Sequence, residues 1–370
     1  MKVHGAVLRE MGLAKPYGSS QPLAIEELEL DPPGPGELLV RVHAAGLCHS
    51  DLSVIDGSRP RVMPMVLGHE AAGEVVEAGD WTPGFAPGDH VVLAFVPTCG
   101  HCVPCLSGRA ALCEPGAAAN TAGTLLSGER RWREGFHHHL GVSAFADHIV
   151  VSAQSAVKVD DDLPYEIAAL FGCAVLTGVG AATNSARVTA DDRVAVFGLG
   201  GVGLAALLGA VVSGAGTVVA IDVVPEKLEL ARELGATHVV QAADDVVSAV
   251  RELTGGGADK AIETVGSARV LADAYAATRR GGTTVTVGLP HPEQMLSIPA
   301  VSLVAEERTL KGSYLGSSVP KRDIPRFIEM YRAGRLPVDR LLTHRLSLDE
   351  LNEGFDRLAA GQGVRQAVIF

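Results

Sequence analysis

Apolar and polar positions follow two different patterns along the chain. Over roughly the first 175 residues, short Val-rich runs such as ELLVRVHAAG (37–46) and GEVVEAG (73–79) are separated by stretches rich in Gly and Pro. Apolar runs bounded by turn residues are typical of a domain built from strands and turns. Residues 116–139 contain no such run and include the charged stretch ERRWRE. We therefore expect an irregular surface loop there.

From about residue 187 onward, apolar runs alternate with helical patterns. The expected strands are RVAVFG (193–198), TVVAID (217–222), ADKAIETVG (258–266) and GGTTVTVG (281–288), and the expected helices are PEKLELARELGA (225–236), DDVVSAVRELTG (244–255) and SARVLADAYAATRRG (267–281). This repeated alternation predicts an α/β fold with a doubly wound parallel sheet and right-handed crossovers. Towards the C-terminus, DIPRFIEMYRAG (323–334) and LSLDELNEGFDRLAAG (346–361) predict helices before a last strand, RQAVIF (365–370).

Residues 194–221 form an uncharged run of 28 residues, which raises the question of a membrane span. Glycines interrupt this run and β-branched residues dominate both of its ends, as expected for a buried strand, helix and strand of a parallel sheet. The N-terminal sequence MKVHGAVLREMG has neither the apolar core nor the cleavage site of a secretory signal. We expect a cytoplasmic protein without a membrane segment.

Composition and charge narrow the classes of function. Charged residues make up 20% of the 370 residues and the hydrophobic set makes up 47%, so the chain can bury a sizeable core. The formal net charge of −12 is the opposite of the basic footprint that nucleic-acid-binding proteins carry. We expect no nucleic-acid partner.

The segment G-L-G-G-V-G at 198–203 matches the G-x-G-x-x-G pattern of dinucleotide-binding loops. It follows an expected strand and opens the helical run LAALLGAVVS, and Asp222, nineteen positions after Gly203, ends the next strand. In this context the pattern predicts a dinucleotide site, although a glycine-rich turn without a ligand remains the alternative. Gly198 would allow the tight turn, Gly200 the approach of the backbone to a pyrophosphate, and Gly203 the close packing of helix on strand. Gly201 and Val202 open the helix.

The start of the helix after the glycine loop and the end of the next strand together predict which dinucleotide binds. The helix N-terminus offers free N–H groups and the positive end of its dipole to phosphate groups. Asp222 would accept hydrogen bonds from the adenosine ribose hydroxyls. Residues 223–225 (Val-Val-Pro) supply no arginine for a 2′-phosphate. The sequence therefore favours NAD over NADP.

Four of the six cysteines lie within fifteen positions. Cys99, Cys102, Cys105 and Cys113 follow the pattern C-x₂-C-x₂-C-x₇-C. Because no secretory signal is present, we expect a reducing compartment and a metal site rather than disulfides. Four thiolates so spaced can enclose one tetrahedral zinc, which would be structural because no coordination position stays open. An iron–sulfur cluster is one alternative, but the x₇ gap and the missing Cys-Pro do not suit it. Unliganded core cysteines are the other.

Two further segments each offer one metal ligand. G-L-C-H-S-D at 46–51 contains Cys48, and G-H-E-A-A-G at 68–73 contains His69. With a cysteine from elsewhere they could form a Cys₂His zinc site whose open fourth position permits catalysis. Taken alone, either residue would more often be a buried structural side chain. Their occurrence together with the dinucleotide loop favours the catalytic interpretation.

Together these motifs resemble the zinc-dependent alcohol dehydrogenases of the medium-chain dehydrogenase/reductase family, whose own catalytic ligand type is Cys₂His. The resemblance is to the long liver and class III form, and it is closer to aryl and allyl alcohol dehydrogenases. It also rests on F-G-C-A-V-L-T-G around Cys173 and on the C-terminal G-V-R-Q, which occur in family order. It implies a GroES-like, β-rich catalytic domain (1–175 and 318–370) and a Rossmann domain (176–317).

The family pattern implies a role for each matching residue. Cys48, His69 and Cys173 would hold the catalytic zinc, and Cys173 could not have been chosen from spacing. Glu70 resembles a carboxylate that can approach the metal. Asp51 resembles the carboxylate that accepts the free ring N–H of the zinc-bound histidine, a turn or cap aspartate being its alternative role. Further matches are Ser50 for proton transfer and His49, Arg365, Thr177 and Lys227 for the cofactor.

The implied reaction is transfer of a hydride between NAD and an alcohol or aldehyde, with two Zn²⁺ per chain, one catalytic and one structural. Ser50 would pass the alcohol proton outward. Ser53 stands where liver-type enzymes carry a relay histidine, so the relay could end at solvent, at Ser53 or at His49. The long form of residues 116–139 implies a homodimer whose Rossmann sheets meet edge to edge.

The residues that match the family's substrate pocket are apolar: Phe95, Leu140 and Leu289. They favour a primary alcohol or aldehyde, either allylic or aromatic. Class III enzymes, which act on S-(hydroxymethyl)glutathione, carry an arginine where this chain has Ala117. That activity is one alternative. The others are a zinc-free quinone or enoyl reductase, a polyol dehydrogenase and a non-enzymatic zinc protein that binds nucleotide.

His137, His138 and His139 could suggest a further metal site. Neighbouring residues on an extended chain point to opposite faces, so three in a row rarely bind one metal. We expect them to be surface or packing residues.

Overall fold

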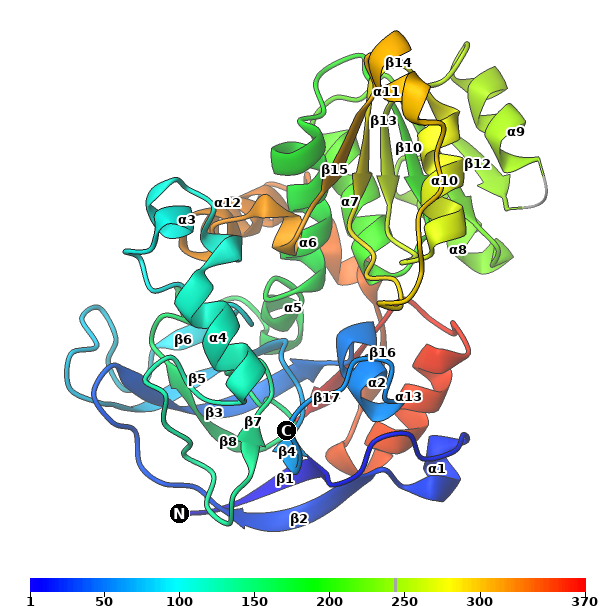
Figure 1. Cartoon of the computed structure of the whole chain (residues 1–370). Coiled ribbons are helices and arrows are strands. Elements are labelled where there is room, and N and C mark those ends of the chain that lie inside the picture. Colours follow the sequence, from blue (N-terminus) through cyan, green and yellow to red (C-terminus); the bar gives the residue numbers. More distant parts are fainter. Residues whose placement is uncertain (243–244) are drawn as a thin grey trace. The chain divides into compact units, whose positions relative to one another are not determined.

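The computed structural model describes residues 1–242 and 245–370, and the chain divides into two compact units (Figure 1). The first unit contains residues 1–173, 319–325 and 342–370, and the second contains residues 174–318 and 326–341. The change of unit after Cys173 lies two residues before the expected boundary. Residues 326–341, expected in the catalytic domain, belong to the second unit instead. The reason is that the 3₁₀ turn η4 (Val338–Leu341) buries Val338 and Leu341 and contacts helix α7 (Gly201–Val212).

The first unit is built mainly from antiparallel strands. Its strands are β1 (Lys2–Leu8), β2 (Leu23–Glu29), β3 (Glu37–Gly46), β4 (Met65–Val66), β5 (Ala71–Ala78), β6 (His90–Leu93), β7 (His137–His138), β8 (His148–Ser152), β9 (Ala156–Val159), β16 (Leu342–Leu346) and β17 (Arg365–Ile369). Its helices are α1 (Tyr17–Ser20), α2 (His49–Ile55), α3 (Val103–Leu106), α4 (Glu114–Ala122), α5 (Tyr165–Leu170) and α13 (Leu351–Ala359). The 13-residue helix α12 (Pro320–Arg332) begins in this unit and continues into the second.

Two sheets enclose the core of the first unit. The smaller sheet has the order β2-β1-β4-β7, and the larger one runs β16-β17-β3-β5-β6-β9 with β8 paired to β3. Strand β3 is the centre of the larger sheet, since it pairs antiparallel with β17, β5 and β8. Its sequence, ELLVRVHAAG, is buried at all but two positions, because both faces of the strand are covered. The ends of β3 and β5 carry the motifs that contain Cys48 and His69.

The second unit is a parallel sheet covered by helices. Its strands are β10 (Arg193–Phe197), β11 (Thr217–Asp222), β12 (His238–Gln241), β13 (Ala258–Glu263), β14 (Thr278–Thr286) and β15 (Thr309–Gly312), and its helices are α6 (Ala174–Gly180), α7 (Gly201–Val212), α8 (Pro225–Glu233), α9 (Val246–Leu253), α10 (Ala268–Ala277) and α11 (Ala300–Ala305). The order β12-β11-β10-β13-β14-β15 is all parallel and corresponds to the order 3-2-1-4-5-6 of the doubly wound fold. The predicted fold class is confirmed.

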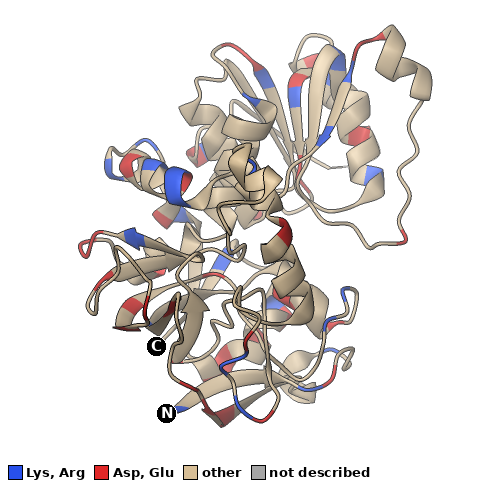
Figure 2. Cartoon of the chain, turned by 60° about the vertical axis from the view of Figure 1, so that its left-hand side comes forward, with Lys and Arg blue, Asp and Glu red and all other residues tan. Residues whose placement is uncertain are grey.

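The uncharged run 194–221 forms β10, α7 and β11 inside this sheet. The hydrophobic side chains of β10 and β11 are buried, and so is most of α7, which explains the apolar character of the whole run. Within the described residues, no helix combines the length and the apolar character that a membrane span needs. Acidic and basic residues occur side by side along the chain in each unit (Figure 2).

Some expected elements differ from the observed ones. The interval 116–139, expected as an irregular loop, begins inside α4, whose N-cap is Cys113, and ends one residue after β7. Strands β12 and β15 were not expected; each is four residues long and only partly buried. The helix expected from residue 244 is observed as α9, and Asp244 itself lies outside the described residues.

Candidate active site

Three side chains from distant segments converge in the first unit. Cys48 is the N-cap of α2, His69 immediately precedes Glu70 and β5, and Cys173 follows α5. Their ligand atoms all lie within 4.8 Å of one another, and all three residues are buried. The geometry thus brings together the three residues that the family pattern pairs with a catalytic zinc.

The two ring nitrogens of His69 have different environments. Nδ1 lies 3.1 Å from Oδ1 of the buried Asp51, which fixes the ring orientation. Nε2 is buried and has no hydrogen-bond partner among the described residues. A buried ring nitrogen without a partner is costly unless it coordinates a metal or meets a ligand. The donor set of two sulfurs and this nitrogen fits Zn²⁺.

The two sulfurs of this group are poised to bind a cation. The thiol of Cys173 hydrogen-bonds to Cys48 and, with His69, holds the pKa of Cys48 well below its ordinary value. The same contact, together with burial, raises the pKa of Cys173. The first thiolate therefore forms readily, whereas the second requires a compensating positive charge. A divalent cation held by Cys48, His69 and Cys173 would supply that charge.

Asp51 is charged although it is fully buried. Burial by itself would raise its pKa, but the imidazoles of His69 and His139 outweigh burial, and its pKa lies below the ordinary value. The backbone N–H of Gly68 also donates to Oδ1 at 3.1 Å. Gly68 has φ +90° and a Cβ there would lie 2.6 Å from the backbone nitrogen of Phe145, so only glycine fits next to His69.

Glu70 and Arg365 form a buried ion pair beside the three ligands. Arg365, on β17, donates to Oε1 of Glu70, and the two side chains are 5% and 0% exposed. Burial raises the pKa of Glu70, while the guanidinium group favours its charged form. A Cβ on Gly46 would lie 2.3 Å from Oε1 of Glu70, so the glycine at this end of β3 makes room for the carboxylate.

The expected pocket residues have different surroundings. Phe95 is buried and meets His69 edge to face, with ring centroids 5.4 Å apart. Leu140 is also buried, at a backbone φ of 51°. Leu289 belongs to the second unit and is 51% exposed. Its place in the pocket remains a prediction, as do the roles of Phe95 and Leu140.

Ser50 and its neighbours lie on α2. Ser50 is partly exposed, and the hydroxyl of Ser53 donates to the carbonyl of Ser50 at 2.8 Å. That bond engages the Ser53 hydroxyl within its own helix. His49, the first residue of α2, is exposed.

Of the three consecutive histidines, two are buried packing residues and one is partly exposed. His138 and His139 are 0% and 1% exposed, and His137 is half-buried. His138 accepts a hydrogen bond from the backbone of Arg131 at 3.1 Å. His139 Nδ1 lies 3.0 Å from Oδ1 of Asp51. This contact was not predicted, because spacing alone gives no sign that His139 folds back onto Asp51.

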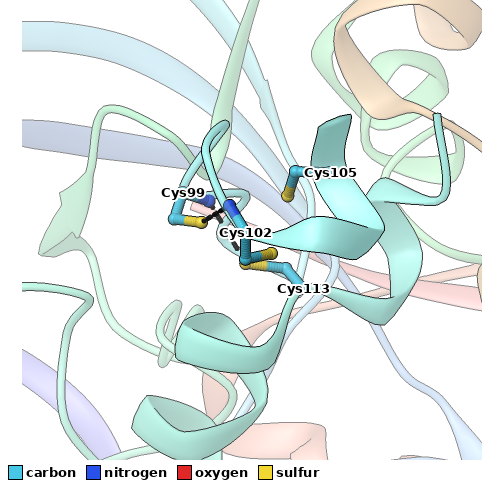
Figure 3. Close-up of side chains that lie close together, drawn as sticks. All are labelled: Cys99, Cys102, Cys105 and Cys113. Atoms are coloured by element: carbon cyan, nitrogen blue, oxygen red, sulfur yellow. Dashed lines mark hydrogen bonds between the residues drawn. The ribbon is translucent and has the colours of Figure 1, made fainter. Parts of the chain in front are cut away.

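The four clustered cysteines form a second group of potential metal ligands (Figure 3). The ligand atoms of Cys99, Cys102, Cys105 and Cys113 lie within 4.8 Å of one another, and all six cysteines are free of disulfides. The backbone N–H of Cys105 lowers the pKa of Cys102 to about 6, whereas burial raises that of Cys105 to about 12. Backbone N–H groups also approach Cys99 and Cys113, at 3.3 and 3.2 Å. Four sulfurs with N–H donors around them suit a closed tetrahedral metal site.

The glycine loop has the geometry of a phosphate cradle. Gly198 has φ +90°, and a Cβ on Gly203 would lie 1.8 Å from the carbonyl oxygen of Gly198. A Cβ on Gly200 would meet no described atom within 4 Å, so the space in front of this residue is open. Helix α7 begins directly afterwards at Gly201, and its first-turn N–H groups face that opening.

Asp222 ends β11 beside this loop. Its Oδ2 accepts from the backbone N–H of Leu199 at 2.6 Å, and its Oδ1 accepts from that of Val224 at 2.9 Å. The carboxylate is thereby fixed at the carboxyl end of the strand. Thr177 is buried in α6 and Lys227 is half-buried in α8. Their contacts with a cofactor remain predictions.

Two family models match the chain. The alcohol dehydrogenase GroES-like domain matches residues 34–161, and the zinc-binding dehydrogenase domain matches residues 201–333. Among curated proteins, the NDMA-dependent alcohol dehydrogenase of Amycolatopsis methanolica is 41% identical over 376 residues, covering 100% of this chain and 99% of that protein. The geraniol dehydrogenase of Castellaniella defragrans is 38% identical over 377 residues, covering 100% and 98%.

A solved structure agrees over the whole chain. The benzyl alcohol dehydrogenase of Acinetobacter calcoaceticus superposes with a TM-score of 0.94 at 33% identity, covering 100% of this chain and 99% of that one. The similarity extends through both units, and the converging ligand groups lie within the segments that resemble the family. The chain therefore belongs to the zinc-dependent alcohol dehydrogenases of the medium-chain dehydrogenase/reductase family, which use a nicotinamide cofactor.

Proposed function

We propose that this protein oxidises a primary allylic or aromatic alcohol to its aldehyde, with NAD as the hydride acceptor. The carbon–hydrogen bond of the alcohol breaks with transfer of a hydride to NAD, and the hydroxyl proton leaves to solvent. The observation that carries the proposal is the convergence of Cys48, His69 and Cys173 with a buried, unpartnered Nε2 on His69. Two sulfurs and one imidazole are the ligand set that leaves a zinc ion one open position.

The bound zinc supplies Lewis acidity that lowers the pKa of the alcohol hydroxyl. The residues of the chain prepare that chemistry. Asp51 accepts the Nδ1–H of His69 and thereby directs Nε2 toward the two sulfurs. Ser50 Oγ takes the hydroxyl proton of the alcohol and passes it outward. The hydroxyl of Ser53 is already engaged with the Ser50 carbonyl, so the solvent or His49 is the better end of the relay.

NAD rather than NADP is the proposed cofactor. The open space in front of Gly200 and the start of α7 would receive the pyrophosphate. Asp222 would accept hydrogen bonds from the adenosine ribose, and its negative charge would repel a 2′-phosphate. Residues 223–225 offer no arginine to offset that repulsion. His49, Thr177, Lys227 and Arg365 are further proposed cofactor contacts.

The substrate class rests on the apolar side chains near the ligands and on the relatives. Phe95 and Leu140 are buried in the first unit, and Phe95 contacts His69. Geraniol dehydrogenase and benzyl alcohol dehydrogenase are named for one allylic and one aromatic alcohol. Ala117 provides no cation for the carboxylate of a glutathione adduct. An apolar primary alcohol therefore fits the site better.

We also propose a second, structural zinc in the lobe of Cys99, Cys102, Cys105 and Cys113 and a homodimer formed through β15. Strand β15 is an edge of the six-stranded sheet. The preceding segment exposes Met295, Val301 and Val304 at 85%, 72% and 82%. Unpaired strand edges next to exposed apolar side chains are typical of association surfaces. Analytical ultracentrifugation of the purified protein tests this, and a monomer at micromolar concentration would contradict it.

The experiment that tests the function is a panel of alcohols assayed with three acceptors. Benzyl alcohol, geraniol, ethanol, sorbitol and formaldehyde with glutathione would each be offered with NAD, NADP or NDMA, the last because a relative is named for it. We expect the highest kcat/KM with benzyl alcohol or geraniol and NAD. Turnover confined to the glutathione adduct or to sorbitol would refute the substrate class. Turnover only with NADP or NDMA would refute the acceptor.

A further inference from the structure

Three nitrogen atoms lie close to the same carboxylate oxygen of Asp51. Its Oδ1 lies 3.1 Å from His69 Nδ1, 3.1 Å from the backbone nitrogen of Gly68 and 3.0 Å from His139 Nδ1. Its Oδ2 is buried and has no hydrogen-bond partner within the described part of the chain. A buried carboxylate is stable only when its oxygens are well paired. The second imidazole is therefore relevant to how Asp51 is held.

The backbone around His139 is fixed by a tight buried turn. The His139 N–H donates to the Ser143 hydroxyl at 2.9 Å, and the His139 carbonyl accepts from the N–H groups of Val142 and Ser143 at 3.0 and 3.2 Å. Within this turn, Leu140, Gly141 and Ser143 have φ values of 51°, 66° and 57°. Positive φ at a residue other than glycine costs about 1 kcal/mol or more, so the surrounding contacts must maintain this turn.

The same turn is joined to the segment that carries His69. The N–H groups of Ala144 and Phe145 donate to the carbonyls of Gly68 and Leu67, both at 3.0 Å. The His139 and His69 rings meet edge to face, with centroids 5.5 Å apart and an interplanar angle of 89°. The main-chain contacts that position His69 therefore also position His139. Both imidazoles therefore lie against the same carboxylate, that of Asp51.

The ring of His139 has a donor where Asp51 needs one. The imidazole of His139 carries at least one ring N–H, and its Nδ1 lies 3.0 Å from Oδ1 of Asp51, an oxygen that can only accept when the carboxylate is ionised. The neighbouring carboxylate favours that proton on Nδ1. Nδ1 of His139 and Oδ2 of Asp51 are both buried, and neither has a hydrogen-bond partner among the described residues. Because the terminal torsion of aspartate is broad, a small rotation gives each imidazole its own oxygen.

We propose that His139 is a positioning residue, whose Nδ1–H donates to Asp51 and holds the carboxylate in the orientation that fixes His69. Its effect on the reaction passes through Asp51 and His69 to the proposed zinc, so the inference rests on the proposed function. His139 would slow loss of the catalytic zinc and keep His69 Nε2 directed at it. Removing partners of a metal-bound histidine commonly weakens metal affinity about 10- to 100-fold. Since His139 is one contact further away, we expect about a 10-fold effect.

The test compares variants that keep or remove the donor. His139→Phe keeps a ring but has no N–H, whereas His139→Asn places an amide N–H near the position of Nδ1. His137→Phe is the matched control, since His137 is half-buried and its Nε2 lies 3.5 Å from the guanidinium group of Arg130. The readouts are the rate of zinc transfer to a chelating dye and the sulfur-to-cobalt charge-transfer spectrum of the cobalt-substituted protein. A purely packing role predicts that the Phe and Asn variants change both readouts equally, whereas a donor role predicts that only the Phe variant does.

We expect His139→Phe to lose its catalytic zinc about 10-fold faster and to shift the cobalt spectrum. His139→Asn should stay within about 3-fold of wild type, and His137→Phe should match it. Equal zinc loss in wild type and His139→Phe, or equal impairment in the Phe and Asn variants, would overturn the proposal. Should His139→Phe not fold, His139→Leu replaces it, because leucine has nearly the shape of asparagine without the N–H.

The wild-type zinc content separates this inference from the proposed function. If wild type holds zinc only in the cysteine lobe, the proposed function fails and the inference fails with it. If wild type holds both zinc ions and every His139 variant retains them equally well, only the inference fails. A third metal ion that His139→Asn loses would also overturn the positioning role, because Asp51, His69 and His139 would then be a metal site themselves.

Discussion

The glycine loop allows a prediction in which two substitutions in one motif affect different properties. Gly203→Ala should lower the stability of the protein, and Gly200→Ala should weaken NAD binding. Gly200 and Gly203 belong to one motif, but their surroundings differ. A Cβ on Gly200 would meet no described atom within 4 Å, and its backbone, at φ −70° and ψ −173°, is extended and open to any residue. A Cβ on Gly203 would lie 1.8 Å from the Gly198 carbonyl oxygen and 2.8 Å from the Thr264 hydroxyl.

The stability cost differs accordingly. Carbon and oxygen rarely approach closer than about 3.3 Å, so Gly203→Ala must separate α7 from β10 by roughly 1.5 Å. Such overpacking costs about 1–3 kcal/mol, and we expect the upper end because a backbone carbonyl hydrogen-bonded to Thr264 cannot yield like a flexible side chain. At about 2–4 °C per kcal/mol, the Tm falls by roughly 6–12 °C. Gly200→Ala only replaces an N-cap glycine, at about 1 kcal/mol or less.

Gly200→Ala is expected to weaken the binding of the cofactor. A methyl group on Gly200 would occupy the open space that we propose for the pyrophosphate of the cofactor. We expect Gly200→Ala to raise the Kd for NAD at least about 10-fold, which corresponds to about 1.4 kcal/mol, while the protein stays folded. Differential scanning calorimetry and calorimetric titration with NAD measure the two effects. Wild-type NAD affinity in Gly200→Ala, or a wild-type Tm in Gly203→Ala, would refute the reasoning.

Three further predictions concern groups elsewhere in the chain. Cys105→Ser should remove one zinc per chain and lower the Tm, while NADH formation by the remaining folded enzyme persists; unchanged zinc content by mass spectrometry would contradict the structural site. Arg365→Leu leaves the Glu70 carboxylate buried and unpaired, which should destabilise the protein by about 3–5 kcal/mol in urea unfolding, and Glu70→Gln in the same chain should recover part of that loss. Arg193 and Arg279 both donate to the carboxylate of Asp259 and hold its pKa below the ordinary value despite burial. The ionised Asp259 therefore stabilises the folded protein above about pH 4, and this contribution disappears as the pH falls further. Asp259→Asn should therefore cost about 2 kcal/mol at pH 7 and flatten the dependence of the unfolding free energy on acid pH; an unchanged acid dependence would count against this assignment.

The second unit could be predicted well from sequence because its elements are long and strongly patterned. Strands β10 and β11 are continuous apolar runs, and Gly198, Gly200 and Gly203 mark the turn between β10 and α7. Strands β12 and β15 were missed because they are short and partly exposed. They are strands because the neighbouring strand in the sheet offers hydrogen bonds, and no local pattern encodes that.

The candidate site was predictable only in part for the same reason. Motifs around Cys48 and His69 indicated ligands, but Cys173 lies over a hundred residues further along and came only from the family resemblance. The contact of His139 with Asp51 depends on a buried turn that returns to the His69 segment. The pairing of Glu70 with Arg365 joins residues 295 positions apart through the antiparallel pairing of β17 with β3. Tertiary structure alone brings these groups together.

The central claim is that Cys48, His69 and Cys173 hold a zinc ion that the reaction requires. Mass-spectrometric zinc analysis of wild type and Cys173→Ser, each assayed for NADH formation with benzyl alcohol or geraniol, tests it most directly. We expect two zinc ions per wild-type chain, and one in Cys173→Ser together with at least about a 100-fold loss of kcat/KM. Two zinc ions in the variant, or a wild-type enzyme that is active with only one, would contradict it.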